Sequence, residues 1–322
     1  MRHLISLTDL GPDDLAHLVR RAVRLAERTE PPAPGPERTL DRRRVGIYFR
    51  KSSTRTRTAF WSAAVALGAD AIAFGPDDLQ ISTGETLQDT AKTLSRYLDA
   101  LVVRTNEDVQ ELRDLAAAGD LAVVNALTLD EHPTQAVADL TTLAEHFGEL
   151  SGRHVLCVGE GNSSARALAL AAALTPGLRL TLLCPEGYTV PDEHLKLLDE
   201  IGDGSLVTQE TEPARVSGPV DAVYTSRWRT MGVPKEDPDW IRAFDGFRID
   251  DAFLDRVGGP DTVFLHDLPA VRGQEVTDEV LDGPRSLAWR QAFHKMTAAM
   301  AVLEWCLLDG APGARDEGGG TP

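Results

Sequence analysis

The chain has 322 residues, a length that fits two compact domains better than one. Its formal net charge of −17 excludes a general affinity for nucleic acid, because phosphate backbones attract basic surfaces. Cysteines without paired spacing, and no apolar run approaching the roughly 18 residues of a membrane span, predict a soluble cytoplasmic protein. The cysteines, which we expect in the core, are Cys157, Cys184 and Cys306.

Segments typical of strands alternate with segments typical of helices along the chain. An amphipathic helix is expected first, within residues 10–29, with Thr8 and Asp9 available to cap it. Such alternation implies parallel sheets with helical crossovers. Strands are predicted at 45–49, 71–74, 100–105, 121–127, 154–159, 178–184, 221–226 and 262–266. Further helices are predicted from near Ser53 and at 86–98, 111–119, 133–147, 163–175, 194–202 and 287–308.

The two series of elements predict an α/β protein with two doubly wound parallel-sheet domains joined by interdomain helices. A polar turn at 148–152 separates the two series. The last helix is long enough to reach back across this boundary, and the final residues have the composition of a disordered tail. The expected divisions are a first domain at 1–147, a second domain at 148–290, a closing helix at 291–310 and the tail at 311–322.

Hydroxyl and guanidinium groups follow the first predicted strand, where a helix begins. Free backbone N–H groups at a helix start, together with such side chains, can converge on one phosphate. The alternative is that the hydroxyls cap the helix while the arginines lie on its solvated face. The residues concerned are Ser53, Thr54, Arg55, Thr56 and Arg57.

These residues, with Phe49 and Lys51, are similar to the FxKxSTRTR segment of the aspartate and ornithine carbamoyltransferase family. Residues 84–105 resemble the second conserved region of that family, and 131–143 resemble its HPTQALADxxT segment. Residues 266–283 resemble its HCLPxxRGxEVTDEV segment, typical of the ornithine branch. Because four motifs occur in order with matching separations, the chain is identified as a member of this superfamily.

The resemblance implies a first domain that binds carbamoyl phosphate and a second that binds the amino substrate. An amine attacking an acyl phosphate develops negative charge on the carbonyl oxygen and on the departing phosphate, so cations and donors must be in place beforehand. Catalytic roles are implied for Arg104, His132, Thr54 and Arg55. Carbamoyl phosphate ligands are implied at Ser53, Thr54, Arg55, Thr56, Gln80, Arg104, His132, Gln135, the Leu268 carbonyl and Lys295.

Two of these positions bear on assembly and on phosphate geometry. In the family, a neighbouring subunit of a trimer supplies one residue to the phosphate site, and Gln80 falls at that position, which implies a homotrimer with shared sites. Lys295 stands where the family usually has arginine, so the charge is kept but the bidentate geometry is lost. The arginines already supply the positive charge of a Lewis acid, so we expect no metal and no cofactor.

Three segments that grip the amino substrate in ornithine enzymes are altered. Ser163 replaces the second asparagine of GDGNN, Ser226 replaces the aspartate expected to pair with an α-ammonium group, and Asp267 replaces the thiol of HCLP. Arg227 matches an arginine that binds the substrate carboxylate in aspartate-type members. The implied second-substrate residues are Asn162, Ser163, Ser226, Arg227, Thr230, Met231, Asp267 and Leu268.

The sequence therefore predicts carbamoyl transfer to an ornithine-related amine or amino acid, with Asp267 and Arg227 setting specificity. Drift that leaves ornithine as the acceptor is one alternative, and an aspartate-specific enzyme is another. A noncatalytic homologue that binds carbamoyl phosphate is a third. A dinucleotide-binding oxidoreductase is suggested by the glycines of 155–167, but the GxGxxG spacing is incomplete. For His132 and Arg104, ordinary structural roles remain the alternatives to catalysis.

Overall fold

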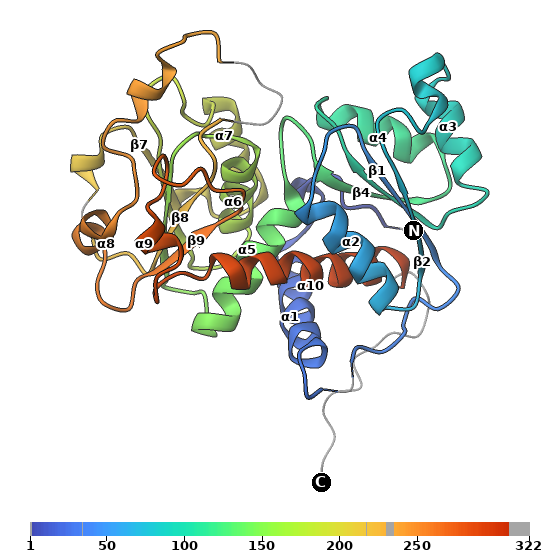
Figure 1. The fold of residues 1–322 in the computed structure, drawn as a ribbon, viewed down its shortest axis with the longest axis horizontal. Coiled ribbons are helices and arrows are strands. Elements are labelled where there is room, and N and C mark those ends of the chain that lie inside the picture. The colour runs from blue at the N-terminus through green and yellow to red at the C-terminus, as the bar shows by residue number, and fades with distance from the viewer. Residues whose placement is uncertain (1, 34, 217, 230–234, 309–322) are drawn as a thin grey trace.

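The computed structural model describes residues 2–33, 35–216, 218–229 and 235–308. Two parallel β-sheets form separate halves, visible on either side of the helical centre in Figure 1. The first sheet has the order β2-β1-β3-β4. Its strands are β1 (Arg44–Phe49), β2 (Asp70–Phe74), β3 (Ala100–Arg104) and β4 (Ala122–Leu127). All its pairs are parallel, so the carboxyl ends of β1, β3 and β4 lie at one edge.

The second sheet has the order β7-β6-β5-β8-β9, and its pairs are also parallel. In both sheets the chain begins at a central strand and winds toward both edges, which confirms the predicted doubly wound α/β fold. The strands are β5 (His154–Val158), β6 (Arg179–Leu183), β7 (Val207–Glu210), β8 (Ala222–Thr225) and β9 (Val263–His266).

Helices connect successive strands and cover the sheets. They are α1 (Pro12–Thr29), α2 (Arg55–Ala66), α3 (Leu87–Leu94), α4 (Val109–Ala118), α5 (Pro133–Phe147), α6 (Ser163–Ala173), α7 (Asp192–Ile201), α8 (Asp251–Val257), α9 (Asp278–Leu281) and α10 (Ala288–Leu307). Short 3-10 helices cover Leu7–Asp9, Gln80–Thr83, Gly204–Leu206, Pro213–Arg215 and Trp240–Phe244. No helix within the described ranges is both long and apolar enough to span a membrane.

The start of the first helix differs from the expectation. Thr8 and Asp9 do not cap it, because they belong to a separate 3-10 turn that Ser6 caps, with Asp9 completing a reciprocal capping box. Helix α1 instead begins at Pro12 after Gly11, where the missing proline N–H costs no hydrogen bond.

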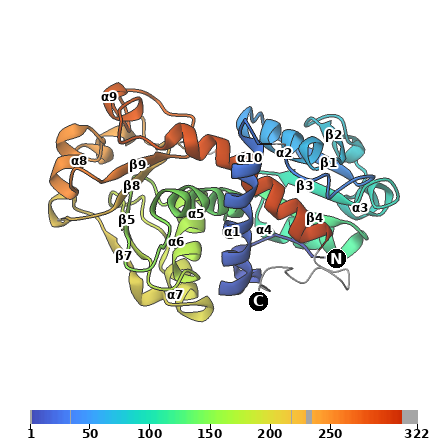
Figure 2. The same ribbon diagram turned by 90° about the horizontal axis from the view of Figure 1, so that it is seen from below.

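Helices α1, α5 and α10 pack together at the centre of the molecule. Figure 2 shows α10 running from the second sheet to the first half, where it also packs on α2. Residues of α5 are buried on every side from Pro133 to Leu143, as in a helix enclosed by other elements. All three cysteines are buried, as expected. The division at 147/148 stays a prediction, and the expected tail lies outside the described residues.

Candidate active site

A pocket of about 200 Å³ opens at the carboxyl ends of strands from both sheets. In open parallel sheets, loops that follow the strands at this edge form the usual ligand site. The lining residues are Ser52, Ser53, Thr54, Arg55, Thr56, Arg104, Leu127, His132, Gln135, Asn162, Ser163, Ser164, Ser226, Arg227, Arg229, Asp267, Leu268, Pro269 and Lys295. The pocket therefore brings together residues from all four matched motifs, from the altered segments at 162–163 and 226–227, and Lys295 from α10.

The turn between β1 and α2 presents the hydroxyl and guanidinium groups predicted from sequence. Thr54 is the N-cap residue, but its side chain caps no described backbone N–H. The capping alternative therefore fails for Thr54, and the first N–H groups of α2 are left for a ligand. Arg57 is exposed and is not among the described residues that line the pocket, because side chains two positions apart on a helix, here Arg55 and Arg57, point to different faces.

Arg104 ends β3 and is only 5% exposed. Its Nη1 donates a hydrogen bond to Ser53 Oγ at 3.2 Å, which ties the strand end to the phosphate turn. Burial lowers the pKa of both Arg104 and Arg55, while the charge of Asp267 opposes that shift in each. Both guanidinium groups stay charged near neutral pH, since arginine starts from a very high pKa. A solvated strand-end charge is therefore the wrong interpretation of Arg104.

His132 is the N-cap residue of α5 and is buried beside the same cations. Burial, and then the charges of Lys295 and Arg104, hold the pKa of His132 well below its usual value, so the ring is neutral at pH 7. The hydroxyl of Thr134 lies 3.5 Å from Nδ1. If that hydroxyl donates, the ring proton is on Nε2, where it can be donated to a carbonyl oxygen.

Glu131, next to His132, fixes the position of this segment. Its carboxyl accepts hydrogen bonds from Ser6 Oγ at 2.6 Å and from the Leu7 N–H at 2.7 Å. Burial raises the pKa of Glu131 to about 7. The N-terminal turn is thus attached directly to the strand-to-helix connection that carries His132.

Lys295 reaches the pocket from α10 and donates a hydrogen bond to Oε1 of Gln135. Burial lowers the pKa of Lys295 to about 8, although Asp267 and Asp139 oppose the shift. The lysine therefore brings a titratable charge to a pocket whose other cationic side chains are arginines.

Phosphate binding is accordingly expected to weaken above pH 8. The charged form of Lys295 attracts the dianion, so affinity is full below the lysine pKa and is lost as pH rises through it. We expect the dissociation constant of inorganic phosphate, measured by calorimetry, to rise about tenfold between pH 8 and about pH 9.5. Lys295→Arg should flatten this limb, because guanidinium stays charged. A flat wild-type profile would exclude a role for Lys295 in binding the anion.

The start of α6 carries the altered asparagine segment. Asn162 caps the helix, and its Oδ1 accepts the N–H groups of Ser164 at 3.0 Å and Ala165 at 3.1 Å. Its Nδ2 donates to Ser226 Oγ at 2.9 Å. Both ends of the Asn162 amide are thus bonded within the protein, while Ser163 lies in the pocket wall. Asn162 thus caps α6 and holds the Ser226 loop, and it also lines the pocket.

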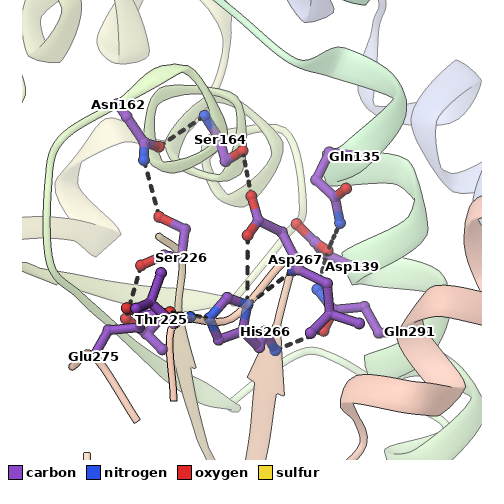
Figure 3. Close-up of polar contacts among 12 residues, drawn as sticks. Gln135, Asp139, Asn162, Ser164, Thr225, Ser226, His266, Asp267, Glu275 and Gln291 are labelled. Atoms are coloured by element: carbon purple, nitrogen blue, oxygen red, sulfur yellow. Dashed lines mark hydrogen bonds and ion pairs between the residues drawn. The ribbon is translucent and has the colours of Figure 1, made fainter. Parts of the chain in front are cut away.

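Asp267 follows β9 and faces the cations of the pocket. Its Oδ2 accepts a hydrogen bond from Ser164 Oγ at 2.9 Å, as Figure 3 shows. Ser164 lines the pocket and was missed by the sequence analysis, which ended its motif one residue earlier. Ser52, Leu127, Arg229 and Pro269 are further lining residues that it missed, and all of them except Leu127 adjoin a predicted one.

Two arginines line the side of the pocket where the amino substrate is expected, which we call the acceptor side. The Nε of Arg227 is buried and has no hydrogen-bond partner among the described residues. Arg229 is exposed and lines the same wall. Thr230 and Met231, also predicted as substrate residues, lie outside the described residues. The Arg227 Nε is a donor for which a bound carboxylate would be a suitable partner.

Of two further predicted ligands of carbamoyl phosphate, Leu268 lines the pocket, whereas Gln80 is not among its described lining residues. Gln80 is exposed at a 3-10 turn, where its Oε1 accepts from Thr83 Oγ1 at 2.8 Å, and it is not among the described residues that line this chain's pocket. Leu268 has a φ of 54° and lines the pocket, and its N–H donates a hydrogen bond to His266 Nδ1 at 2.8 Å.

No group of three or more metal-binding side chains gathers among the described His, Cys, Asp and Glu residues.

Comparisons with known proteins agree with this geometry. Residues 2–145 match the carbamoyl-P binding domain of aspartate/ornithine carbamoyltransferases, and residues 151–306 match the Asp/Orn binding domain. An ornithine carbamoyltransferase of Rhodococcus opacus is 38% identical over 314 residues, which cover 95% of this chain and 96% of that protein. One from Halalkalibacterium halodurans is 36% identical, with 95% of each chain covered.

Solved structures show the same relationship. The ornithine carbamoyltransferase from Pyrococcus furiosus superimposes with a TM-score of 0.89 at 33% identity, covering 96% of this chain and 98% of that one. The enzyme from Thermus thermophilus gives a TM-score of 0.84 at 32% identity, with coverages of 95% and 98%. The chain therefore belongs to the aspartate/ornithine carbamoyltransferase family, in its ornithine carbamoyltransferase branch, and is a carbamoyltransferase.

Proposed function

We propose that the protein transfers the carbamoyl group of carbamoyl phosphate to the primary amine of a small amino acid related to ornithine. The observation that carries the proposal is the composition of the acceptor side of the pocket. There, Arg227 offers a buried Nε without a described partner, and Asp267 offers a carboxylate close to the phosphate-side cations. An acceptor with one carboxylate and one amine matches this pair of charges.

On the phosphate side, the turn after β1 would hold the phosphoryl oxygens with its backbone N–H groups and hydroxyls. The carbonyl oxygen would lie between Thr54, Arg104 and His132, each of which lines the pocket and carries a hydrogen-bond donor. The amine nitrogen attacks the carbonyl carbon, the C–N bond forms, and the bond from that carbon to the phosphate oxygen breaks. Phosphate would leave with the electron pair beside Arg55 and Arg104, and one proton would pass from the amine nitrogen to the leaving phosphate.

On the acceptor side, the carboxylate would meet Arg227 while the reacting amine approaches Asp267. Ser226, which replaces the aspartate of ornithine enzymes, is already bonded to Asn162, so an α-ammonium group would find no carboxylate at that position. The second candidate is ornithine itself, and the relatives named ornithine carbamoyltransferase favour it.

An acceptor screen tests both candidates. We would measure kcat/KM with carbamoyl phosphate for ornithine, lysine, 2,4-diaminobutyrate, 2,3-diaminopropionate, aspartate and guanidino amino acids. Putrescine is the matched control, because it is ornithine without its carboxylate. The proposal requires putrescine to be the poorer member of that pair. Highest turnover with ornithine would establish the second candidate, and equal turnover of the pair would overturn the role of Arg227.

Arg227→Gln is expected to raise KM for the best amino-acid acceptor by about tenfold, because a charge-assisted hydrogen bond is lost. The KM for putrescine should stay unchanged, since that ligand has no carboxylate. Arg248→Gln removes an exposed arginine outside the pocket and serves as the control. Equal effects on both ligands would show that Arg227 acts through the fold of the loop.

We further infer a cytoplasmic homotrimer in which Gln80 completes the phosphate site of a neighbour. Exposed apolar side chains support a subunit contact at this end of the molecule, namely Trp61 and Val65 on α2 and Ile72 on the edge strand β2. Light scattering should give three times the mass of one chain. A monomer that turns over fully would exclude shared sites.

A further inference from the structure

Asp139 is a fully buried carboxylic acid behind the pocket. It lies on α5, one helical turn after Gln135, and is not among the described residues that line the pocket. Its Oδ1 accepts two amide hydrogen bonds, from Gln135 Nε2 at 2.6 Å and from Gln291 Nε2 at 2.6 Å. Figure 3 shows the carboxyl between these two side chains, which come from α5 and α10.

This arrangement decides which way both amides face. An oxygen that only accepts requires each glutamine to turn its NH2 group toward Asp139 and its carbonyl oxygen away. The Gln135 Oε1 then faces the pocket and Lys295, while the Gln291 Oε1 accepts the N–H of His266 at 2.8 Å. Burial raises the pKa of Asp139 to about 7, yet Oδ1 remains an acceptor even when Oδ2 carries a proton.

A chain of hydrogen bonds runs from Gln291 through His266 to Leu268 in the pocket wall. This ring is fully buried, and its Nδ1 accepts the N–H of Leu268 at 2.8 Å. Its Nε2 lies 3.2 Å from Oε1 of the buried Glu275, so the proton belongs on Nε2. Leu268 has a φ of 54°, a conformation that costs free energy for a residue with a Cβ and is held here by the contact to His266.

We propose that Asp139 is a positioning residue that aligns, through Gln135 and Gln291, two acceptors for the carbamoyl NH2 group. These acceptors are Gln135 Oε1 and the Leu268 carbonyl, so the inference rests on the proposed placement of the carbamoyl group. The NH2 group has two N–H donors, and both must find acceptors when water is excluded. The alignment therefore selects carbamoyl phosphate over an acyl phosphate that carries a methyl group in place of the NH2.

Acetyl phosphate supplies that comparison, because it differs from carbamoyl phosphate only in the methyl group. Asp139→Leu leaves both amides free to turn. We expect it to raise the dissociation constant of carbamoyl phosphate about tenfold, while those of acetyl phosphate and inorganic phosphate change less than about twofold. Asp139→Asn keeps an oxygen that can accept from both amides and should restore most of the selectivity. A general loosening of the pocket would weaken all three ligands together.

Gln291→Leu tests the contribution of Gln291 with a change on α10 that leaves the hydrogen bond between Gln135 and Asp139 in place. It removes the acceptor for the His266 N–H and should lower the carbamoyl-to-acetyl selectivity by about threefold to tenfold. This variant decides the question if Asp139→Leu does not fold. Selectivity unchanged from wild type in folded Asp139→Leu, or in Gln291→Leu when the former fails, overturns the inference.

Gln135→Met separates this inference from the proposed function. If this variant loses selectivity while Asp139→Leu keeps it, the carbamoyl placement holds and the positioning role is wrong. If Gln135→Met also keeps full selectivity, the placement of the carbamoyl group against Gln135 is itself wrong. The binding measurements require no amino substrate, so they are independent of which amine the enzyme uses.

Discussion

Replacing Arg104 by methionine is expected to lower kcat/KM for carbamoyl phosphate by about 1000-fold. The guanidinium is 5% exposed at the end of β3 and bonded to Ser53, and under the proposed function it would serve both the carbonyl oxygen and the phosphate. Loss of one fixed donor in a water-poor site typically costs 100- to 1000-fold, and this side chain would serve two developing charges at once. Phosphate release at varied carbamoyl phosphate concentration measures the loss.

The matched control is Arg96→Met, which removes an exposed arginine that is not among the described residues lining the pocket and should leave the rate within about twofold. Arg104→Lys should recover only part of the loss, because an ammonium group cannot reproduce the planar fork of donors. More than a tenth of wild-type activity in Arg104→Met would remove this residue from the chemical step.

Changing Asp267 to asparagine should raise the affinity for phosphate and lower kcat. The carboxylate opposes the positive charges of Arg55, Arg104 and Lys295, so its neutralisation should tighten phosphate binding about tenfold. The reacting amine would lose its anionic partner, and we expect kcat to fall about 100-fold. Calorimetry with phosphate and steady-state turnover with the best acceptor give the two values.

Ser164→Ala is the control for this variant, because it removes the hydrogen bond to Asp267 but keeps the charge. Phosphate affinity should then be unchanged, with a smaller fall in kcat. If Asp267→Asn weakens phosphate binding, the carboxyl organises the anion site and does not merely counter its charge. If kcat is unaffected, Asp267 has no part in holding the amine.

Most of the fold could be predicted from sequence, because β-rich runs and helical periods alternate so regularly. The exceptions include strand β7, which was not predicted, and the residues Thr8 and Asp9, which show the limit of local patterns. A potential cap was visible there, but Ser6 uses those residues for a turn of its own, which the contact with Glu131 fixes from a distance of 125 positions. Such a long-range contact leaves no periodic trace in a single sequence.

For the site, residues of the matched motifs, including Arg104 and His132, line one pocket together with Lys295, while their roles stay predictions. The residues missed include Asp139 and Gln291, which contact residues of the pocket and are not among its described lining residues themselves. The spacing of Gln135 and Asp139 is one helical turn and could have suggested their contact. Nothing in the sequence around Gln291, 152 positions later, indicates that it bonds to the same carboxyl. Asn162 was identified, but its use as the cap of α6 depends on where that helix begins.

The position of α10 has a consequence for how the protein is made. This helix is the last described element, yet Leu303 and Met300 are fully buried in the core it shares with α1, α2 and α5, and Glu304 pairs with Arg21. During synthesis the earlier elements emerge well before α10. The apolar side chains of α1, α2 and α5 that α10 later covers therefore stay exposed to solvent during that time. We expect ribosome-bound chains that lack α10 to require chaperones until α10 has emerged.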